Sequence, residues 1–247
     1  MSRRAAAFFA PPLAAVLLAA GGAAAQSVSV DLGGQGALTL QVVQLMALLT
    51  VLSLAPGIAM MVTCFPFMIT VLSILRQAVG VQQAPPNMMI VSLALFLTYF
   101  VMAPVFDEAW DRGVAPLMEG RATTDIAFAE TMAPIRAFME RRVDPATVEA
   151  LAEAAPGREA PPPGAEAPLS LLIPGFLLSE IKRGFEIGFL IFIPFLIIDL
   201  VVASILMAMG MMMVPPAVVS LPFKLAFFVL ADGWTLLAGA LVRGYGP

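Results

Sequence analysis

Hydrophobic residues dominate long stretches of this chain and are interrupted by one charged segment. Apolar blocks cover 38–75, 88–106 and 169–242, and the charged segment occupies 107–168. One membrane-spanning helix needs about 20 apolar residues, so the longest blocks exceed a single span. We therefore expect an all-α membrane protein with about four hydrophobic helical segments, arranged as kinked hairpins, and a small helical periplasmic insert.

Prolines and glycines predict where the first two blocks bend and turn. Pro56-Gly57 divides the first block and Pro66 falls in its second half, so we expect a kinked or broken path there. Gly80 and the run Pro85-Pro86-Asn87 mark a polar turn before the second block. Arg76, beside this turn, favours a cytoplasmic location through the positive-inside tendency.

The last block contains an unusual arrangement of charges and methionines. Between residues 187 and 242 the only charged residues are Asp199, Lys224 and Asp232. A charge inside a hydrocarbon-length segment costs roughly 2.5–3.5 kcal/mol, so a partner or a wet path must compensate it. The segment 207–216 holds five methionines and ends in Pro215-Pro216. The pattern predicts two membrane-length helices, one with an acid and one with a base, joined by a methionine turn.

Three interpretations of Asp199 and Lys224 are open: a structural ion pair, a proton relay, or separate partners. The two residues lie 14 and 11 positions from Met213, the centre of the expected turn. At ~1.5 Å per helical residue their depths differ by only ~5 Å, so the side chains can bridge, and we favour the ion pair. An intramembrane aspartyl protease needs a second aspartate in a Gly-x-Gly-Asp context, which Ala231-Asp232-Gly233 does not provide.

The methionines of the turn have two interpretations. Methionine is flexible and fills irregular apolar gaps, so these residues can be core filler. In a hairpin turn they can instead project into a lumen as a soft seal. The candidate seal consists of Met209, Met211, Met212 and Met213.

The charged segment has its own predicted structure. Residues 107–168 contain 12 acidic residues and 6 arginines, which is typical of a solvated acidic face outside the cytoplasm. Apolar residues recur at helical spacing over 128–139, which predicts a short amphipathic helix. Asp144 followed by Pro145 is typical of an N-cap and a first helical residue, so a second helix should begin there. The proline-rich stretch 154–168 is expected to be a linker.

A charged collar opens the third hydrophobic block. Glu180 and Arg183 are three positions apart, and Lys182 and Glu186 are four apart, so both pairs can meet on a helix surface. Gly184-x-x-x-Gly188 allows close approach of another helix.

The beginning of the chain resembles a secretory signal peptide. Arg3-Arg4 precedes the apolar stretch 5–20, and the small residues 23–25 precede Gln26, so cleavage is expected between Ala25 and Gln26. An uncleaved first membrane helix is the alternative. The expected organisation is a signal peptide (1–25), a first hydrophobic region (26–106), the periplasmic insert with its linker (107–168) and a second hydrophobic hairpin (169–247).

Composition narrows the possible functions. Hydrophobic residues make up 60% of the chain and charged residues 12%, which is far from the usual balance of a globular protein. The chain has no histidine and one cysteine, Cys64, which excludes Ser-His and Cys-His catalysis and a histidine-built metal site. The net charge of −4 speaks against nucleic-acid binding. We expect no enzyme activity, no metal and no cofactor.

Several short motifs match one known family. They are Leu75-Arg-Gln-Ala-Val-Gly80, Pro85-Pro-Asn87, Leu93-Ala-Leu-Phe-Leu-Thr98, Met102-Ala-Pro104, Ile173-Pro-Gly-Phe176, Glu186-Ile-Gly-Phe-Leu-Ile-Phe-Ile-Pro-Phe-Leu-Ile-Ile-Asp199, Met209-Gly-Met-Met-Met213, Ser220-Leu-Pro-Phe-Lys-Leu225 and Asp232-Gly-Trp234. Together they resemble the FliP family of flagellar type III export-gate proteins. One departure is clear: the family usually reads Thr-Ser-Phe-Thr-Arg-Ile where this chain has Thr63-Cys-Phe-Pro-Phe-Met68, so Phe67 replaces an arginine.

The resemblance implies a place in the flagellar basal body, in the bacterial inner membrane. It implies a homo-oligomer of five copies that forms, with FliQ and FliR, a gate for unfolded flagellar substrates beside FlhB and FlhA. The methionine turn, Met211–Met213 above all, would be the gasket of the closed pore. The alternatives are an ion-coupled transporter that uses Asp199 and Lys224, which lacks the expected inverted repeat, and a structural scaffold without a channel.

Overall fold

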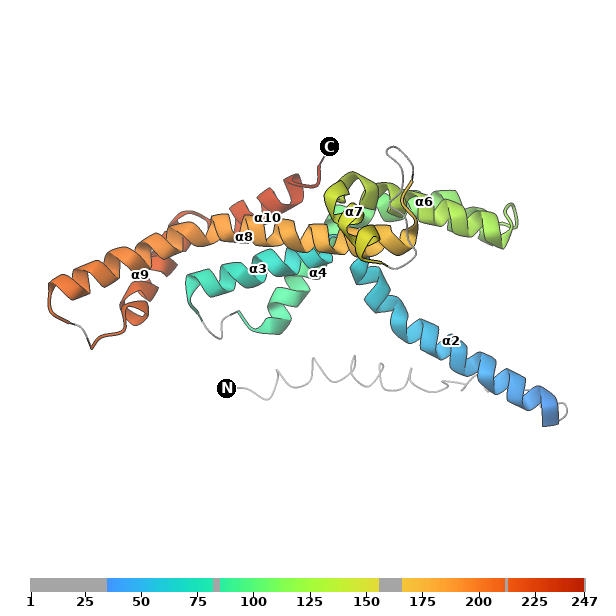
Figure 1. Cartoon of the computed structure of the whole chain (residues 1–247), viewed down its shortest axis with the longest axis horizontal. Helices are drawn as coiled ribbons and strands as arrows, with labels where there is room; N and C mark the ends of the chain where they lie inside the picture. Colours follow the sequence, from blue (N-terminus) through green and yellow to red (C-terminus); the bar gives the residue numbers. More distant parts are fainter. Residues whose placement is uncertain (1–34, 82–84, 156–165, 212, 247) are drawn as a thin grey trace, which may run out of the picture. The chain divides into compact units, whose positions relative to one another are not determined.

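The structure is a computed structural model that describes residues 35–81, 85–155, 166–211 and 213–246. Every regular element in these ranges is a helix, so the expected all-α fold is confirmed (Figure 1). The expected cleavage site, Ala25 and Gln26, lies outside the described residues, as does Met212. The chain divides into two compact units, residues 1–52 and 53–247.

The first described helix is α2, Gln35–Met61, which is apolar on all sides. Its stretch Val42–Met61 is long and apolar enough to cross a membrane. Helix α2 runs through Pro56, so the helix is not broken there; the break in the first hydrophobic block lies after Met61. Helix α2 ends at Met61, and Pro66 occupies the first turn of the next helix. The N–H groups of a first turn have no intrahelical partner, so a proline is tolerated there and a new helix begins at this point.

Helices α3 (Phe65–Val79) and α4 (Asn87–Ala109) follow, and Gly80 ends α3 in a left-handed conformation with φ of 84°. The helix that contains the second hydrophobic block extends beyond Phe106. Helix α4 passes through Pro104 and continues into a π-helical turn, Trp110–Val114, and the short α5, Ala115–Met118. One long helical path therefore leads from the second block directly into the insert.

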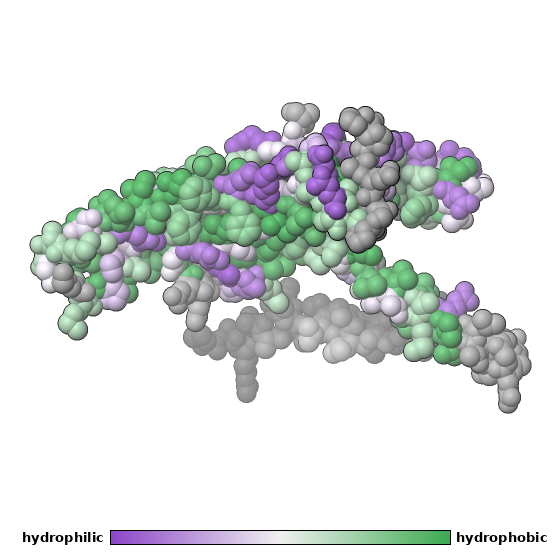
Figure 2. Space-filling model, in the orientation of Figure 1, coloured by the Kyte–Doolittle hydropathy of each residue, from purple (hydrophilic) through white to green (hydrophobic). Residues whose placement is uncertain are grey.

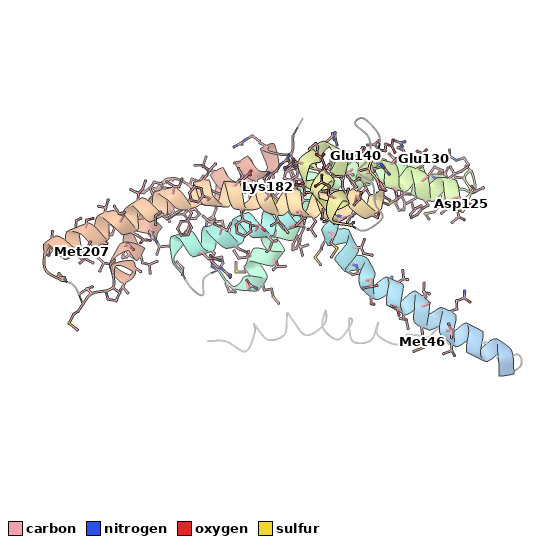
Figure 3. All side chains as sticks on the ribbon, viewed as in Figure 1. Met46, Asp125, Glu130, Glu140, Lys182 and Met207 are labelled. Atoms are coloured by element: carbon pink, nitrogen blue, oxygen red, sulfur yellow. The ribbon has the colours of Figure 1, made fainter. Side chains whose placement is uncertain are left out.

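The insert contains the two expected helices, α6 (Thr124–Arg142) and α7 (Pro145–Ala154). The Asp144 carboxylate accepts a hydrogen bond from the N–H of Ala146 at 3.1 Å, which confirms the predicted N-cap. Figure 3 shows the acidic side chains labelled along α6.

The final block forms α8 (Leu169–Ala208), α9 (Pro216–Leu230) and α10 (Gly233–Arg243). The second arm of the expected hairpin is not one helix, because α9 and α10 meet at an angle of 60°. Asp232 adopts a left-handed conformation with φ of 48°, and a Cβ atom on Gly233 would lie 2.2 Å from the Phe228 ring. This close packing fixes the bend. In the described residues three helices are long and apolar enough to cross a membrane, or four if the bent pair forms one span.

Within the unit 53–247, α3 packs lengthwise on α8. A Cβ atom on Gly184 would lie 2.9 Å from the Cβ of Thr70, and one on Gly188 would lie 2.3 Å from the Cδ1 of Ile74. Both glycines are buried, so the predicted close approach of a second helix at this motif is confirmed. Figure 2 shows hydrophobic surface along α8 toward its methionine end and hydrophilic patches near the insert.

Candidate functional site: the charged hairpin and its methionine turn

The structure brings Asp199 and Lys224 together between α8 and α9. The Nζ atom of Lys224 lies 2.6 Å from one Asp199 carboxylate oxygen, and the Lys224 side chain is buried. The Ser220 hydroxyl donates to the other carboxylate oxygen at 2.5 Å. Both oxygens of the acid therefore have a partner, which is the arrangement that makes a buried charge tolerable.

Lys224 also contacts a third helix. Its ammonium donates to the carbonyl oxygen of Ala78 at 3.1 Å, in the last turn of α3. Carbonyls in a last turn lack intrahelical partners and carry the negative end of the helix dipole, so a cation is favoured there. Lys224 thus joins α3, α8 and α9.

Two of these partners were missed by the sequence analysis. Ser220 precedes Lys224 by four positions, which places both on one face of a helix, so its participation had a detectable signal. Ala78 contributes only a backbone carbonyl, and nothing in the sequence marks it.

The predicted turn residues lie at the ends of the helices. Pro86 is the N-cap residue of α4 and Asn87 its first residue; the Asn87 side chain accepts a hydrogen bond from Arg76 at 3.1 Å. This bond joins the last turn of α3 to the first residue of α4. Pro215 and Pro216 occupy the same positions, N-cap and first residue, in α9.

The described methionines at the turn, Met209, Met211 and Met213, are exposed. Helix α8 ends at Ala208, and Gly210 takes a positive φ of 75° that turns the chain. The exposed fraction is 66% for Met209, 40% for Met211 and 97% for Met213. All three side chains are therefore exposed in the single chain.

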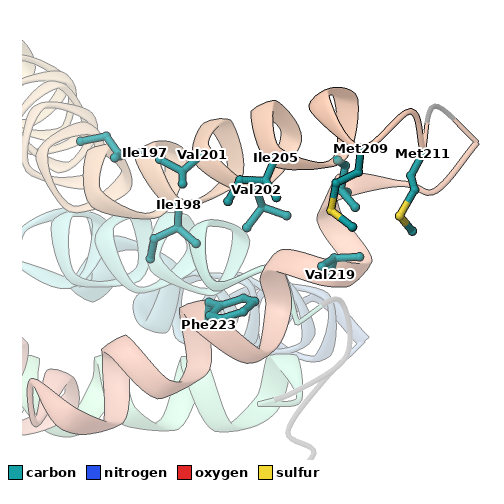
Figure 4. A pocket seen from close by; sticks show the side chains of 10 residues that line it. Ile197, Ile198, Val201, Val202, Ile205, Met209, Met211, Val219 and Phe223 are labelled. Atoms are coloured by element: carbon teal, nitrogen blue, oxygen red, sulfur yellow. The ribbon is translucent and has the colours of Figure 1, made fainter.

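An apolar cavity of about 550 Å³ lies between α8 and α9, next to the turn (Figure 4). The Met209 and Met211 side chains line its turn end. The remaining walls are aliphatic side chains of α8 and α9 together with one aromatic ring, Phe223.

A second buried charge lies at the other end of α8, in the charged collar. Glu180 is fully buried, and its carboxylate lies 3.0 Å from Nε of Arg142, which belongs to α6. The expected pairing of Glu180 with Arg183 is therefore wrong. The pairing of Lys182 with Glu186 is also wrong, because the Lys182 ammonium lies 2.9 Å from the Asp144 carboxylate.

The physical reason for both corrections is the docking of the α6–α7 corner on α8. This docking offers carboxylate and guanidinium partners that no local spacing predicts. The Lys182 ammonium and the N–H of Ala146 both donate to Asp144 and lower the pKa of its carboxyl group. In the described part of the chain no three His, Cys, Asp or Glu side chains are grouped to hold a metal ion.

Comparison with known proteins identifies relatives over most of the chain. Residues 48–241 match the FliP family. The flagellar biosynthetic protein FliP of Caulobacter vibrioides is 52% identical over 90% of this chain and 83% of the relative. The proteins of the same name from Agrobacterium fabrum and Bacillus subtilis are 46% and 45% identical, over 85% and 82% of this chain and 86% and 91% of the relatives.

Proposed function

Because this chain belongs to the FliP family and is a component of flagellar export, we propose that it is a core subunit of the export gate in the inner membrane. In this proposal several copies, five by family resemblance, assemble with FliQ and FliR around a channel for unfolded flagellar substrates. FlhB and FlhA adjoin the gate.

The observation that carries the proposal is the exposed methionine turn at the tip of an apolar hairpin. Met209, Met211 and Met213 are exposed in one chain, so they are available to meet the equivalent residues of other copies. Thioether side chains adapt to varied shapes at little strain, which suits a seal that closes on an empty pore and yields to a substrate.

The neutralised charges of the hairpin support the same proposal. Asp199 and Lys224 satisfy each other within the chain, so the hairpin carries no unpaired charge from this pair beside the pore. This arrangement gives less support to an ion-coupled transporter, which would need a carboxylate free to bind its ion.

The seal is tested by replacing Met211, Met212 and Met213 with alanine in cells that express the gate. We expect subunit levels and assembly to stay nearly intact while ion conductance rises, because turn residues contribute little to helix packing. The matched control replaces Met88, Met89 and Met118 with alanine. These methionines are also exposed, but they are far from the turn in the sequence. Equal conductance in the two triple variants contradicts the seal.

The assembly is tested by purification of the tagged chain from cells. FliQ and FliR should co-purify, and the mass of the complex should require several copies of this chain. Deletion should abolish filament export. Ion-driven solute uptake by the reconstituted chain alone, with neither partner bound, would favour the transporter.

The orientation is tested with single cysteines in a Cys64→Ser background. Met118→Cys lies in the insert and Gln77→Cys lies within the polar stretch 76–87, and both positions are exposed. A membrane-impermeant maleimide that reaches the periplasm should label Met118→Cys only. Labelling of Gln77→Cys instead would reverse the proposed orientation.

A further inference from the structure

A polar cluster joins the insert, the long helix α8 and the segment that follows α10. We propose that Arg142, Glu180 and Tyr245 form a lock that fixes the insert on α8, and that Tyr245 is the residue that positions Arg142 in it. We call these three residues the Glu180 lock.

Glu180 is the residue whose burial requires these contacts. Its side chain has no solvent exposure, and an ionised carboxylate in such a place needs both a countercharge and hydrogen bonds. Arg142 of α6 provides the countercharge at 3.0 Å. The Tyr245 hydroxyl donates to the second carboxylate oxygen. Each oxygen of Glu180 is therefore bound by a different part of the chain.

Arg142 contacts the segment after α10 twice. Its Nη1 donates to the carbonyl oxygen of Gly244 at 3.1 Å, and its guanidinium carbon lies 3.9 Å from the centre of the Tyr245 ring. A guanidinium stacked on an aromatic face gains cation–π attraction and is held flat. Tyr245 therefore orients the fork that Arg142 presents to Glu180.

The Tyr245 ring also packs against aromatic rings of α3 and α6. Phe67 of α3 meets it edge-on at 5.5 Å between centroids, and Phe138 of α6 stacks on it at 6.1 Å. Phe67 is buried and stands where the family motif has an arginine. In this chain the Phe67 ring packs against Tyr245, and Arg142 provides the positive charge that pairs with Glu180.

A neighbouring contact provides a matched control. Asp144 and Lys182 also join the insert to α8, at 2.9 Å, but the Lys182 side chain is mostly exposed. Solvent and salt weaken an exposed pair much more than a buried one. If the lock holds the insert, loss of the buried contact must loosen it far more than loss of the exposed one.

The first experiment measures hydrogen exchange of the backbone amides of α6 and α7 in the full chain. Tyr245→Phe keeps the ring and removes the hydroxyl, and exchange should accelerate roughly tenfold or more, as expected for a lost hydrogen bond to a charged group. Tyr245→Leu should accelerate it further, and Lys182→Gln should change it least. Exchange of Tyr245→Leu at the wild-type rate, or no faster than Lys182→Gln, overturns the proposal.

The second experiment asks whether the Tyr245 hydroxyl senses Glu180, which packing alone does not require. Burial raises the pKa of Tyr245, and the Glu180 carboxylate of α8 raises this pKa further. The positive charge of Arg142 in α6 lowers it, and the Cys64 thiol before α3 raises it. In a Tyr99→Phe background Tyr245 is the single tyrosine of the chain.

The tyrosinate absorbance of this variant should stay absent at the pH where a free tyrosine ionises, about 10, and appear only when the protein unfolds. Adding Glu180→Gln removes the negative charge and should lower the onset in the folded protein. Ionisation of Tyr245 near its ordinary pH in the folded chain, with no response to Glu180→Gln, overturns its place in the lock.

Discussion

Helix α8 carries two acidic residues that each pair with a cation on another helix, and the two pairs are built differently. Near its methionine end, Asp199 pairs with Lys224 of the next helix, α9. Near its beginning, Glu180 pairs with Arg142 of α6, which belongs to the insert. The first pair spans the two arms of a hairpin, and the second joins two parts of the chain that dock on each other.

The two acids also differ in their contact with solvent. The Glu180 side chain is 0% exposed, whereas the Asp199 side chain is 32% exposed. A fully buried carboxylate that loses its cation cannot be rehydrated in place, but a partly exposed one can. Asp199 lies in the more hydrophobic stretch of sequence, yet Glu180 is the acid that is more completely shielded from solvent within the single chain.

The largest effect is expected from Arg142→Met. It leaves the fully buried Glu180 with only the Tyr245 hydroxyl and should cost about 3–5 kcal/mol of unfolding free energy. The double variant Arg142→Met, Glu180→Met should recover much of this loss, because it removes the unpaired charge. Thermal unfolding in detergent measures both. A double variant as unstable as the sum of the two single variants argues against a coupled pair.

A somewhat smaller effect is expected from Lys224→Ala. Asp199 keeps its bond from Ser220 and part of its solvent contact, so the loss should fall at the lower end, about 3 kcal/mol. Asp199→Ala should also impair assembly and motility. The double change should be milder than the sum of the single changes, in unfolding and in motility assays alike. Simple additivity would show that the two residues act separately.

Ser220→Ala should rank third. The hydroxyl donates to a carboxylate from a fully buried position, and a hydrogen bond to a charged group contributes about 1.5–3 kcal/mol. Ser220→Thr, which keeps a hydroxyl, serves as the control in the same unfolding assay. If alanine and threonine are equally destabilising, lost packing rather than the lost bond is the cause.

The smallest effect is expected from Asp144→Asn, which breaks the exposed pair with Lys182. The folded protein lowers the pKa of Asp144 below its ordinary value, so the ionised carboxylate stabilises the fold at neutral pH. That contribution is lost as the pH falls through the lowered pKa. The difference in melting temperature between wild type and Asp144→Asn should therefore shrink on acidification. A difference that grows in acid contradicts the assignment.

Several features of the fold could be predicted because they depend on residues close together in the sequence. The N-cap at Asp144 needs only the N–H of Ala146, two positions on. The contact surface around Gly184 and Gly188 needs only two small residues on one helix face. The meeting of Asp199 and Lys224 needs only that the two residues lie at similar distances, 14 and 11 positions, from the centre of the turn between two helices.

Other features had no local signal. Pro56 lies within a helix, whereas Pro66 lies in the first turn of one. The presence of a proline alone does not predict which of these two positions it takes. The bend at Asp232 arises because the Phe228 ring packs directly against Gly233. These outcomes depend on what each segment packs against.

The sequence alone therefore determined the helical class, the apolar hairpin and the residues of its charge pair, because backbone hydrogen bonds and helical spacing act over a few residues. Only the tertiary structure decided that Glu180 binds Arg142 and that Lys224 also binds Ala78. Long charged side chains have several candidate partners within reach along the sequence. The choice among them follows from which helices dock together and which carboxylate loses its water when they do.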